Sequence, residues 1–263
     1  MRQGRVVHGG AIHGCTPADN GGVRLADGRV VLETEVQWLP PFEPRAIFTL
    51  ALNYADHATE LAQKSSKDQA TFLKAPTEPV VFLKAANAYV GHLGLTRRPK
   101  DAEFMHYECE LAVVIGPGGR DIRRANALDH VLGYTVGNDY AIRNFLEPYY
   151  RPNLRVKNRD GGTVFGPWLV PASEVKDPQA LRLTTHVNGK LVQEGTTADM
   201  IHDVASLIEF LSAIMTLSEG DVILTGTPKG SVDVKPGDEV VCEIEGIGRQ
   251  VNTIVEDWVP ARR

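Results

Sequence analysis

Two glutamates separated by a single residue stand at the start of an apolar segment. Glu108 and Glu110 lead into the run Leu111–Ile115, which has the composition of a buried strand. Side chains two apart in a strand point to the same face, so two carboxylates would meet at the edge of an apolar core. Buried like charges are unfavourable unless a cation lies between them, and ligands that are all oxygen suit Mg²⁺. The pair taken alone is also typical of an exposed edge strand.

A third acid favours the metal-binding interpretation. The apolar run 131–136 leads into Asn138 and Asp139. An aspartate at the end of a buried strand is well placed to complete an oxygen-ligand triad with Glu108 and Glu110. Taken alone, Asp139 would equally suit a turn or a helix cap.

A histidine and a glutamate form a candidate acid/base pair. His57 and Glu60 are three residues apart and share a face of the helix predicted over 53–63, with Asn53 as its cap. A carboxylate beside an imidazole orients the ring and raises its basicity, which suits proton transfer. An ordinary exposed pair is the alternative. The polar stretch that follows, residues 63–72, could close over the pair as a lid.

Two more segments carry groups that suit an anionic ligand. Lys157 lies in a polar, glycine-containing stretch. The loop 225–230 contains Gly226 and Thr227, and its hydroxyl and backbone N–H groups suit a carboxylate. This loop lacks the spacing of a nucleotide-binding loop, and a plain turn is the alternative.

The elements that must position these residues are mainly β-strands with a few short helices. Asn188-Gly189, between two apolar runs, predicts a two-residue hairpin turn. Apolar residues at helical spacing predict a helix over 198–215, capped by Thr197. Apolar or alternating runs bounded by Gly and Pro predict strands over 4–7, 29–37, 80–84, 108–115, 131–136, 182–187, 221–225, 239–245 and 248–255.

Three prolines predict a boundary near the start of the chain. Pro40, Pro41 and Pro44 form a linker-like segment after short strands rich in glycine. We therefore expect a small N-terminal β-rich lobe over 1–44 and a catalytic domain over 45–263.

Composition restricts the class of partner. The 263-residue chain is 43% hydrophobic and has a net charge of −5 without a basic block, which argues against nucleic acid. Neither a membrane-spanning apolar run nor a signal-peptide core is evident. The three cysteines have neither zinc-site spacing nor the pattern of a disulfide framework. These features favour a cytoplasmic protein whose partner is a small molecule.

Taken together, these segments closely resemble the fumarylacetoacetate hydrolase family. The family's motifs occur in the family's order over residues 45–255, and their joint spacing is far more specific than any one of them. NYxxHxxE appears as Asn53–Glu60, FLKxxxAxxG as Phe82–Gly91, ExE as Glu108–Ile115, GxTxxNDxxxR as Gly133–Arg143, and TGTPxG as Thr225–Gly230.

The resemblance implies the family's β-sandwich roll, a homodimer or higher homo-oligomer, and a bound divalent ion. Mg²⁺, or alternatively Mn²⁺, would be held by Glu108, Glu110 and Asp139. Lys157 would lie near the substrate, and His57 with Glu60 would form the lid dyad. Substrate oxygens would be contacted by Lys84, Arg143, Gly226 and Thr227.

Within the family, segments 140–160 and 194–201 resemble the homoprotocatechuate (4-hydroxyphenylacetate) degradation branch. This implies decarboxylation, isomerisation or both of a 2-oxo or 2-hydroxy-diene di- or tricarboxylic acid, through a metal-stabilised enolate. An acylpyruvate hydrolase or oxaloacetate decarboxylase would share the same site, and a non-catalytic carboxylate-binding protein is the alternative of another class. Candidates for the distal carboxylate of the substrate are Arg143, Arg151, Arg155 and Arg159.

Overall fold

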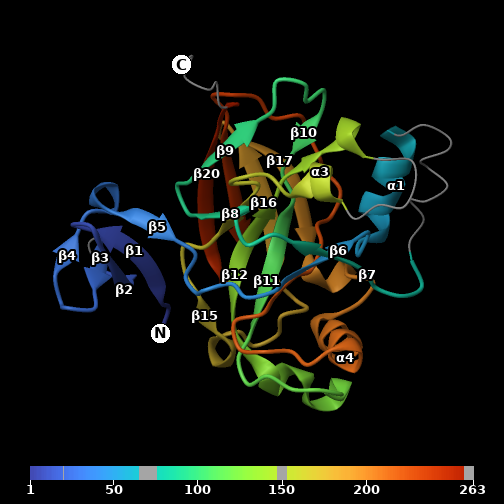
Figure 1. Ribbon diagram of the computed structural model, residues 1–263, viewed down its shortest axis with the longest axis horizontal. Coiled ribbons are helices and arrows are strands. Elements are labelled where there is room, and N and C mark those ends of the chain that lie inside the picture. The colour runs from blue at the N-terminus through green and yellow to red at the C-terminus, as the bar shows by residue number, and fades with distance from the viewer. Residues whose placement is uncertain (20, 65–75, 147–152, 258–263) are drawn as a thin grey trace.

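The computed structural model describes residues 1–19, 21–64, 76–146 and 153–257 (Figure 1). This part of the chain is built mainly from strands with a few short helices, which confirms the predicted fold class. No helix within these ranges is long and apolar enough to cross a membrane. Most of the predicted lid, residues 63–72, lies outside the described residues.

An eight-stranded sheet forms the centre of the molecule. Its order is β7-β6-β18-β11-β12-β14-β8, and β15 also pairs with β12. In the antiparallel pair β11–β12, Glu110 lies opposite Gly137. A Cβ atom at Gly137 would lie 2.5 Å from the Leu224 side chain, so a larger residue would displace that side chain. The strands are β6 (Ile47–Ala51), β7 (Val80–Lys84), β8 (Tyr89–Gly91), β11 (Cys109–Ile115), β12 (Val131–Asp139), β14 (Thr163–Phe165), β15 (Val170–Pro171) and β18 (Val222–Leu224).

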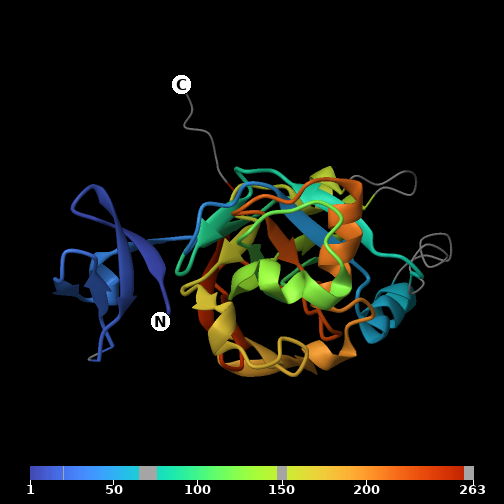
Figure 2. The ribbon, with the colours of Figure 1, turned by 90° about the horizontal axis from the view of Figure 1, so that it is seen from below.

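A five-stranded sheet covers the central one, and the main core lies between them. Leu183, Val240 and Ile254 from this second sheet share one buried cluster with Val113 and other residues of β11. Seen from below, both sheets surround this core (Figure 2). The order is β17-β16-β19-β20-β9, formed by β9 (Leu95–Arg98), β16 (Arg182–Val187), β17 (Lys190–Thr196), β19 (Glu239–Ile244) and β20 (Gly248–Glu256).

The predicted hairpin turn is confirmed between β16 and β17. Val187 pairs with Lys190, which leaves Asn188 and Gly189 as the two turn residues. Both have a positive φ, +50° and +77°, as a type I′ turn requires.

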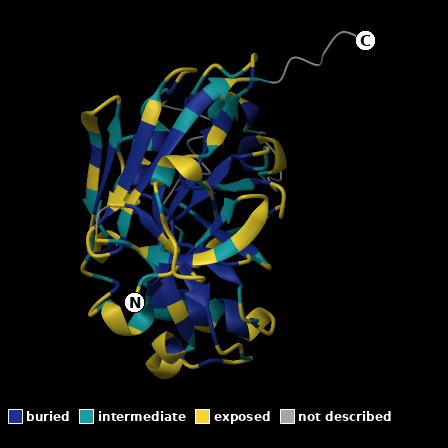
Figure 3. Ribbon diagram, turned by 90° about the vertical axis from the view of Figure 1, so that its left-hand side faces the viewer, coloured by how far each residue is buried: buried dark blue, intermediate teal, exposed yellow. Residues whose placement is uncertain are grey.

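The N-terminal residues form a separate small sheet with a cluster of its own, at the left of Figure 1. Figure 3 looks onto the molecule from this side and shows buried strand residues beneath an exposed rim. The prediction of one continuous strand over 29–37 is wrong. The chain makes a 3₁₀ turn at Glu33–Glu35, where the Glu35 side chain accepts a hydrogen bond from Leu32 N. The order β4-β3-β2-β1-β5 is formed by β1 (Gly4–His8), β2 (Ala11–Pro17), β3 (Val23–Leu25), β4 (Val30–Val31) and β5 (Gln37–Leu39).

This small sheet rests against the central one through aromatic side chains and a close backbone contact. The Trp38 ring lies edge-on to Trp168, with 4.9 Å between the ring centroids. A Cβ atom at Gly91 would lie 2.4 Å from the carbonyl oxygen of Trp38, so only glycine allows this approach. The predicted division of the chain after residue 44 stays a prediction.

The helix predicted over 198–215 begins later than expected. Helix α4 spans Val204–Ile214, and the Asp203 side chain caps it by accepting a hydrogen bond from Ser206 N at 2.8 Å. Thr197 is not the cap, because Met200 forms a β-bridge with Tyr54 and the chain is not yet helical there. The 3₁₀ turns lie at Glu33–Glu35, Arg124–His130, Arg143–Phe145, Ala172–Glu174 and Thr197–Asp199, and a two-stranded pair is formed by β10 (Met105–His106) and β13 (Ala141–Ile142).

Two short helices stand beside the predicted site. Helix α1 spans Ala55–Lys64, and α3 spans Leu154–Lys157. The prediction that Asn53 caps α1 is wrong. Its side chain donates to the carbonyl oxygens of Thr225 and His202, so it ties the start of α1 to the loop after β18.

Candidate metal centre and its pocket

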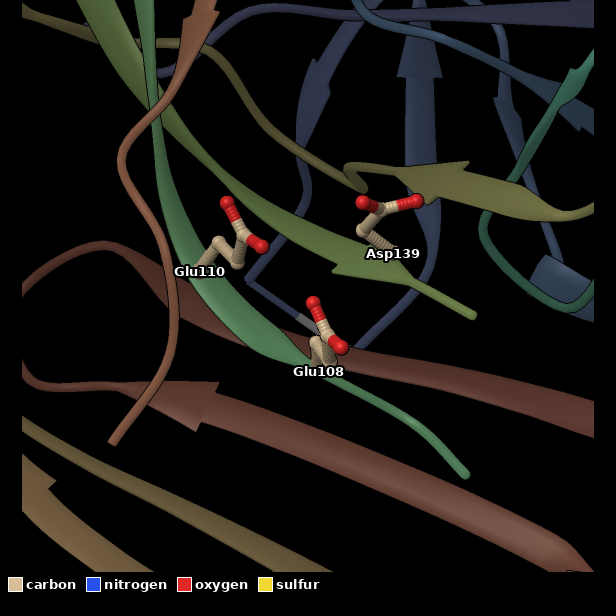
Figure 4. Close-up of side chains that lie close together, drawn as sticks. All are labelled: Glu108, Glu110 and Asp139. Atoms are coloured by element: carbon tan, nitrogen blue, oxygen red, sulfur yellow. The ribbon is translucent and has the colours of Figure 1, made fainter. Parts of the chain in front are cut away.

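Three buried carboxylates from neighbouring strands converge at one end of the central sheet. Glu110 lies on β11, Glu108 immediately precedes that strand, and Asp139 ends β12. One oxygen from each residue lies within 4.8 Å of the others (Figure 4). Glu110 and Asp139 are fully buried, and Glu108 is 6% exposed. The alternative of an exposed edge strand is therefore excluded for this E-x-E pair.

The surroundings shift the pKa values of the two glutamates in opposite directions. Burial raises the pKa of Glu110 well above its ordinary value, and repulsion by Asp139 and Glu108 adds to this effect. Burial would also raise the pKa of Glu108, but the positive charges of Lys157 and Arg143 outweigh it and hold that pKa below its ordinary value.

Three cationic side chains, those of Lys157, Lys84 and Arg143, contact the triad. Lys157 Nζ donates to Glu108 Oε2 at 2.6 Å and to Asp139 Oδ2 at 2.8 Å, so it bridges two of the acids. The ammonium group of Lys84 donates to the other oxygen of Asp139. Burial lowers the pKa of Lys84, whereas for Lys157 the carboxylates of Asp139 and Glu108 outweigh burial and raise the pKa. Lys84 thus contacts Asp139, and its predicted contact with substrate stays a prediction.

One carboxylate oxygen of the triad has no partner among the described residues. Glu110 Oε2 accepts a hydrogen bond from Gly226 N at 2.7 Å, but the buried Oε1 accepts none. An unpaired carboxylate oxygen in the interior is costly, and a cation removes that cost. The donor set contains only oxygen, which is what Mg²⁺ and Mn²⁺ bind. The residues present therefore fit a hard divalent ion.

The two residues predicted as an acid/base pair, His57 and Glu60, lie close together on α1. His57 Nδ1 lies 3.4 Å from Glu60 Oε2, close enough for attraction, although Nδ1 completes no hydrogen bond with any described residue. The His57 side chain is 6% exposed and that of Glu60 17%. Glu60 Oε2 also accepts from Gly230 N and from the Ser231 hydroxyl, so it fastens the loop after β18 to α1.

Arg143 is held by a histidine that sequence reasoning did not select. His106 Nδ1 lies 2.9 Å from the carbonyl oxygen of Tyr107, which can only accept, so Nδ1 carries the ring hydrogen. Nε2 is left as the acceptor for Arg143 Nε at 2.6 Å, and Arg143 Nη2 donates to Glu108 Oε1 at 2.7 Å. Burial, with the Arg143 charge, holds the pKa of His106 well below its ordinary value. The sequence signal that could have pointed to His106 is its position two residues before Glu108.

A cavity of about 190 Å³ lies directly over these groups. Lys84, Glu110 and Asp139 lie beneath its lining, and apolar residues such as Phe82 and Val156 complete it. The predicted site residues that line the cavity are His57, Glu108, Arg143, Lys157, Gly226 and Thr227.

The arginines predicted for a distal carboxylate do not all face this cavity. Arg143 lines it. Arg155 and Arg159 line a separate hollow, with their guanidinium carbons 5.0 and 5.2 Å from the centre of the Phe145 ring. Arg151 lies outside the described residues.

The residues of the triad and of the cavity lie within one continuous part of the chain that a single family model matches. A model of the fumarylacetoacetate (FAA) hydrolase C-terminal family matches residues 46–255. The chain belongs to the fumarylacetoacetate hydrolase family. This confirms the resemblance drawn from the motifs.

Relatives within the fumarylacetoacetate hydrolase family include enzymes of aromatic catabolism. A 4-hydroxyphenylacetate degradation bifunctional isomerase/decarboxylase from Salmonella dublin is 56% identical over 209 residues, which cover 80% of this chain and 46% of that protein. This chain thus spans about half the length of these isomerase/decarboxylases.

Solved structures of the same family show the same fold. A 5-carboxymethyl-2-hydroxymuconate delta-isomerase from Mycobacterium smegmatis has a TM-score of 0.82 and 34% identity, over 98% of this chain and all of that one. A fumarylpyruvate hydrolase from Pseudomonas aeruginosa, solved with Mn²⁺ and pyruvate, has a TM-score of 0.71 and 31% identity, over 82% of this chain and 91% of that one.

Proposed function

We propose that the chain is a metal-dependent enzyme that decarboxylates, isomerises, or both, a 2-oxo or 2-hydroxy-diene di- or tricarboxylic acid of 4-hydroxyphenylacetate catabolism. The observation that carries this proposal is the buried triad of Glu108, Glu110 and Asp139 at a small cavity whose mostly apolar lining includes Arg143, Lys157 and Thr227. The high identity to bifunctional isomerase/decarboxylases supports this choice of reaction.

The triad would hold Mg²⁺, with Mn²⁺ as the alternative. When bound, such an ion supplies Lewis-acid stabilisation of negative charge on the oxygens of a 2-oxo acid. Lys157 places a second positive charge at the same point, since its ammonium group lies within 2.8 Å of both Glu108 and Asp139. Negative charge that develops on the substrate would thus meet a preorganised cationic site.

The remaining cavity residues bind the acid and move protons. Arg143 and Thr227 line the cavity and offer donors to carboxylate or carbonyl oxygens of the substrate, whereas Gly226 N already donates to Glu110 Oε2. In decarboxylation, the electron pair of the broken C–C bond stays on the substrate as CO₂ leaves. In isomerisation of the 2-hydroxy-diene, His57 takes the proton of the 2-hydroxyl group and the charged imidazole returns a proton to a carbon of the conjugated system, which gives the 2-oxo form, while Glu60 stabilises the charged imidazole.

The small cavity and the fumarylpyruvate hydrolase relative support one competing activity. An acylpyruvate hydrolase would use the same groups and would need His57 and Glu60 to activate water. Oxaloacetate decarboxylation remains a further alternative on the same site. A non-catalytic carboxylate-binding protein is disfavoured because an acid/base pair and a bridging lysine accompany the triad.

A direct assay separates these activities. The protein is incubated with Mg²⁺ and 2-hydroxyhepta-2,4-diene-1,7-dioate, and the ultraviolet band of the conjugated diene is followed; acylpyruvates and oxaloacetate are assayed in parallel. We expect the dienedioate band to change and Glu108→Ala to abolish the change. Glu219→Ala, at an exposed glutamate, is the matched control and should behave as wild type. Cleavage of acylpyruvates with no change in the dienedioate would refute the proposal.

A further inference from the structure

A buried glutamine stands behind the loop that contains Thr227. Gln193 lies on β17 and is 3% exposed. Its amide nitrogen donates to the Thr227 hydroxyl oxygen and to the carbonyl oxygen of Pro228, both at 2.9 Å. The loop packs tightly against this strand: a Cβ atom at Gly230 would lie 3.0 Å from Gln193 Cα. The position of the Thr227 hydroxyl is therefore set from β17.

The direction of these hydrogen bonds is fixed by one group that can only accept. The Pro228 carbonyl offers no hydrogen, so the NH₂ side of the Gln193 amide must face it. The amide oxygen must then face Thr185, whose hydroxyl donates to it at 2.7 Å. Because the Thr185 hydrogen is used in this way, the Cys242 thiol, 3.8 Å away, is left to donate to the Thr185 oxygen.

This directed chain ends at the cavity. The Thr227 oxygen accepts from Gln193, and among the described residues its hydroxyl hydrogen is given to no acceptor. Thr227 lines the cavity over the triad. Its hydrogen is therefore available to a ligand there, whereas one lone pair of its oxygen is already occupied.

We propose that Gln193, backed by Thr185, acts as a positioning residue that makes the Thr227 hydroxyl a hydrogen-bond donor toward the cavity. This position then selects an acceptor oxygen of the ligand, as in a carboxylate or a 2-oxo group, and disfavours a ligand hydroxyl that must donate. The inference deepens the proposed function and rests on the proposal that the cavity takes a 2-oxo acid.

The experiment is a double-mutant cycle read by ligand binding. Pyruvate is titrated calorimetrically into the Mg²⁺-loaded protein for wild type, Gln193→Met, Thr227→Val and the double variant. A hydrogen bond to a charged acceptor contributes about 1.5–3 kcal/mol, so Thr227→Val should weaken binding by at least about tenfold. Gln193→Met should weaken it several-fold in wild type and have no further effect in the Thr227→Val background.

Matched variants separate positioning from general packing. Thr227→Ser, which restores a hydroxyl, should recover part of the affinity lost in Thr227→Val and should again respond to Gln193→Met. Thr185→Val should weaken pyruvate binding, whereas Thr184→Val, the same change at the neighbouring residue on the opposite face of β16, should not. Thermal unfolding of each variant confirms that it is folded.

Two results would overturn the inference. One is an equal loss of affinity from Gln193→Met with and without the Thr227 hydroxyl, because Gln193 would then act through packing. The other is a wild-type protein that binds no pyruvate in the presence of Mg²⁺. If wild type binds pyruvate and shows the coupling but does not transform the dienedioate, the proposed function fails and the inference stands.

Discussion

At the scale of single residues, the site depends on carboxylates whose charge is balanced unequally. Within the described part of the chain, Glu108 contacts two cations, whereas Glu110 has one hydrogen bond and a buried oxygen without a partner. This asymmetry makes Glu110 the acid whose ionisation is most unfavourable without a bound cation. Its replacement by a neutral isostere should therefore have opposite effects on stability and on metal binding.

Glu110→Gln should stabilise the protein in EDTA at pH 8, and the gain should shrink toward pH 5. The pKa of Glu110 in the folded protein is raised above its ordinary 4.5. The contribution of wild-type Glu110 to folding stability is therefore complete below pH 4.5 and is lost as the pH rises through the raised pKa, whereas glutamine does not titrate. A change of ~1 kcal/mol moves the melting temperature by roughly 2–4 °C in a domain of this size. Melting curves from pH 5 to pH 8, with exposed Glu219→Gln as control, test this. A gain that does not vary with pH would contradict it.

His106→Leu should raise KM for the dienedioate by about tenfold, with a smaller effect on kcat. The substitution removes the acceptor that holds Arg143 Nε, and hydrogen bonds to charged groups contribute about 1.5–3 kcal/mol. His106→Gln keeps an oxygen acceptor at a similar reach and should lose less. Steady-state kinetics of both variants test this. Equal impairment of the two would show that the ring is needed only to fill space.

At the scale of elements, the site forms where segments distant in sequence are tied together. Asn53 joins the start of α1 to residue 202 before α4 and to residue 225 after β18, through three hydrogen bonds of 2.8–3.0 Å. The motif containing His57 and the loop containing Thr227 are thereby held as one unit. Their relative position depends on this side chain more than on either segment alone.

Asn53→Ala should lower the free energy of unfolding by ~2 kcal/mol and raise KM. It leaves a buried carbonyl at residue 225 and partly buried backbone groups at residue 202 without these partners, and a buried unpaired group costs about 1–3 kcal/mol. Asn87→Ala, at an exposed asparagine with one 3.3 Å hydrogen bond, is the control and should change stability by less than about 0.5 kcal/mol. Urea unfolding of both variants provides the measurement, and equal losses would count against the tie.

Sequence reasoning predicted those elements that depend on local pattern. β7 and β16 have the predicted bounds, and the turn at Asn188 is confirmed, because alternation and turn chemistry are local. The predicted start of α4 was wrong because Met200, although at helical spacing, forms a β-bridge with Tyr54, which is distant in sequence. The His106–Arg143 contact was missed for the same reason: nothing local to either residue indicates the other.

At the scale of the whole molecule, two sheets enclose a core and leave the acidic triad at one end of the central sheet. The family match covers most of this structure, residues 46–255, and leaves out the small N-terminal sheet. The described residues contain one cluster of three acids suited to a metal ion. The proposed chemistry therefore requires one tight divalent site per chain, with the cavity directly above it.

The most direct test of this requirement is a titration of the protein with Mn²⁺, followed by the loss of the free-ion signal in electron paramagnetic resonance. We predict one tightly bound ion per chain, displaced by Mg²⁺, and an affinity that falls by more than about tenfold in Asp139→Asn and in Glu110→Gln. The exposed Glu219→Gln variant should bind as wild type does. Unchanged Mn²⁺ binding in both triad variants would contradict the account.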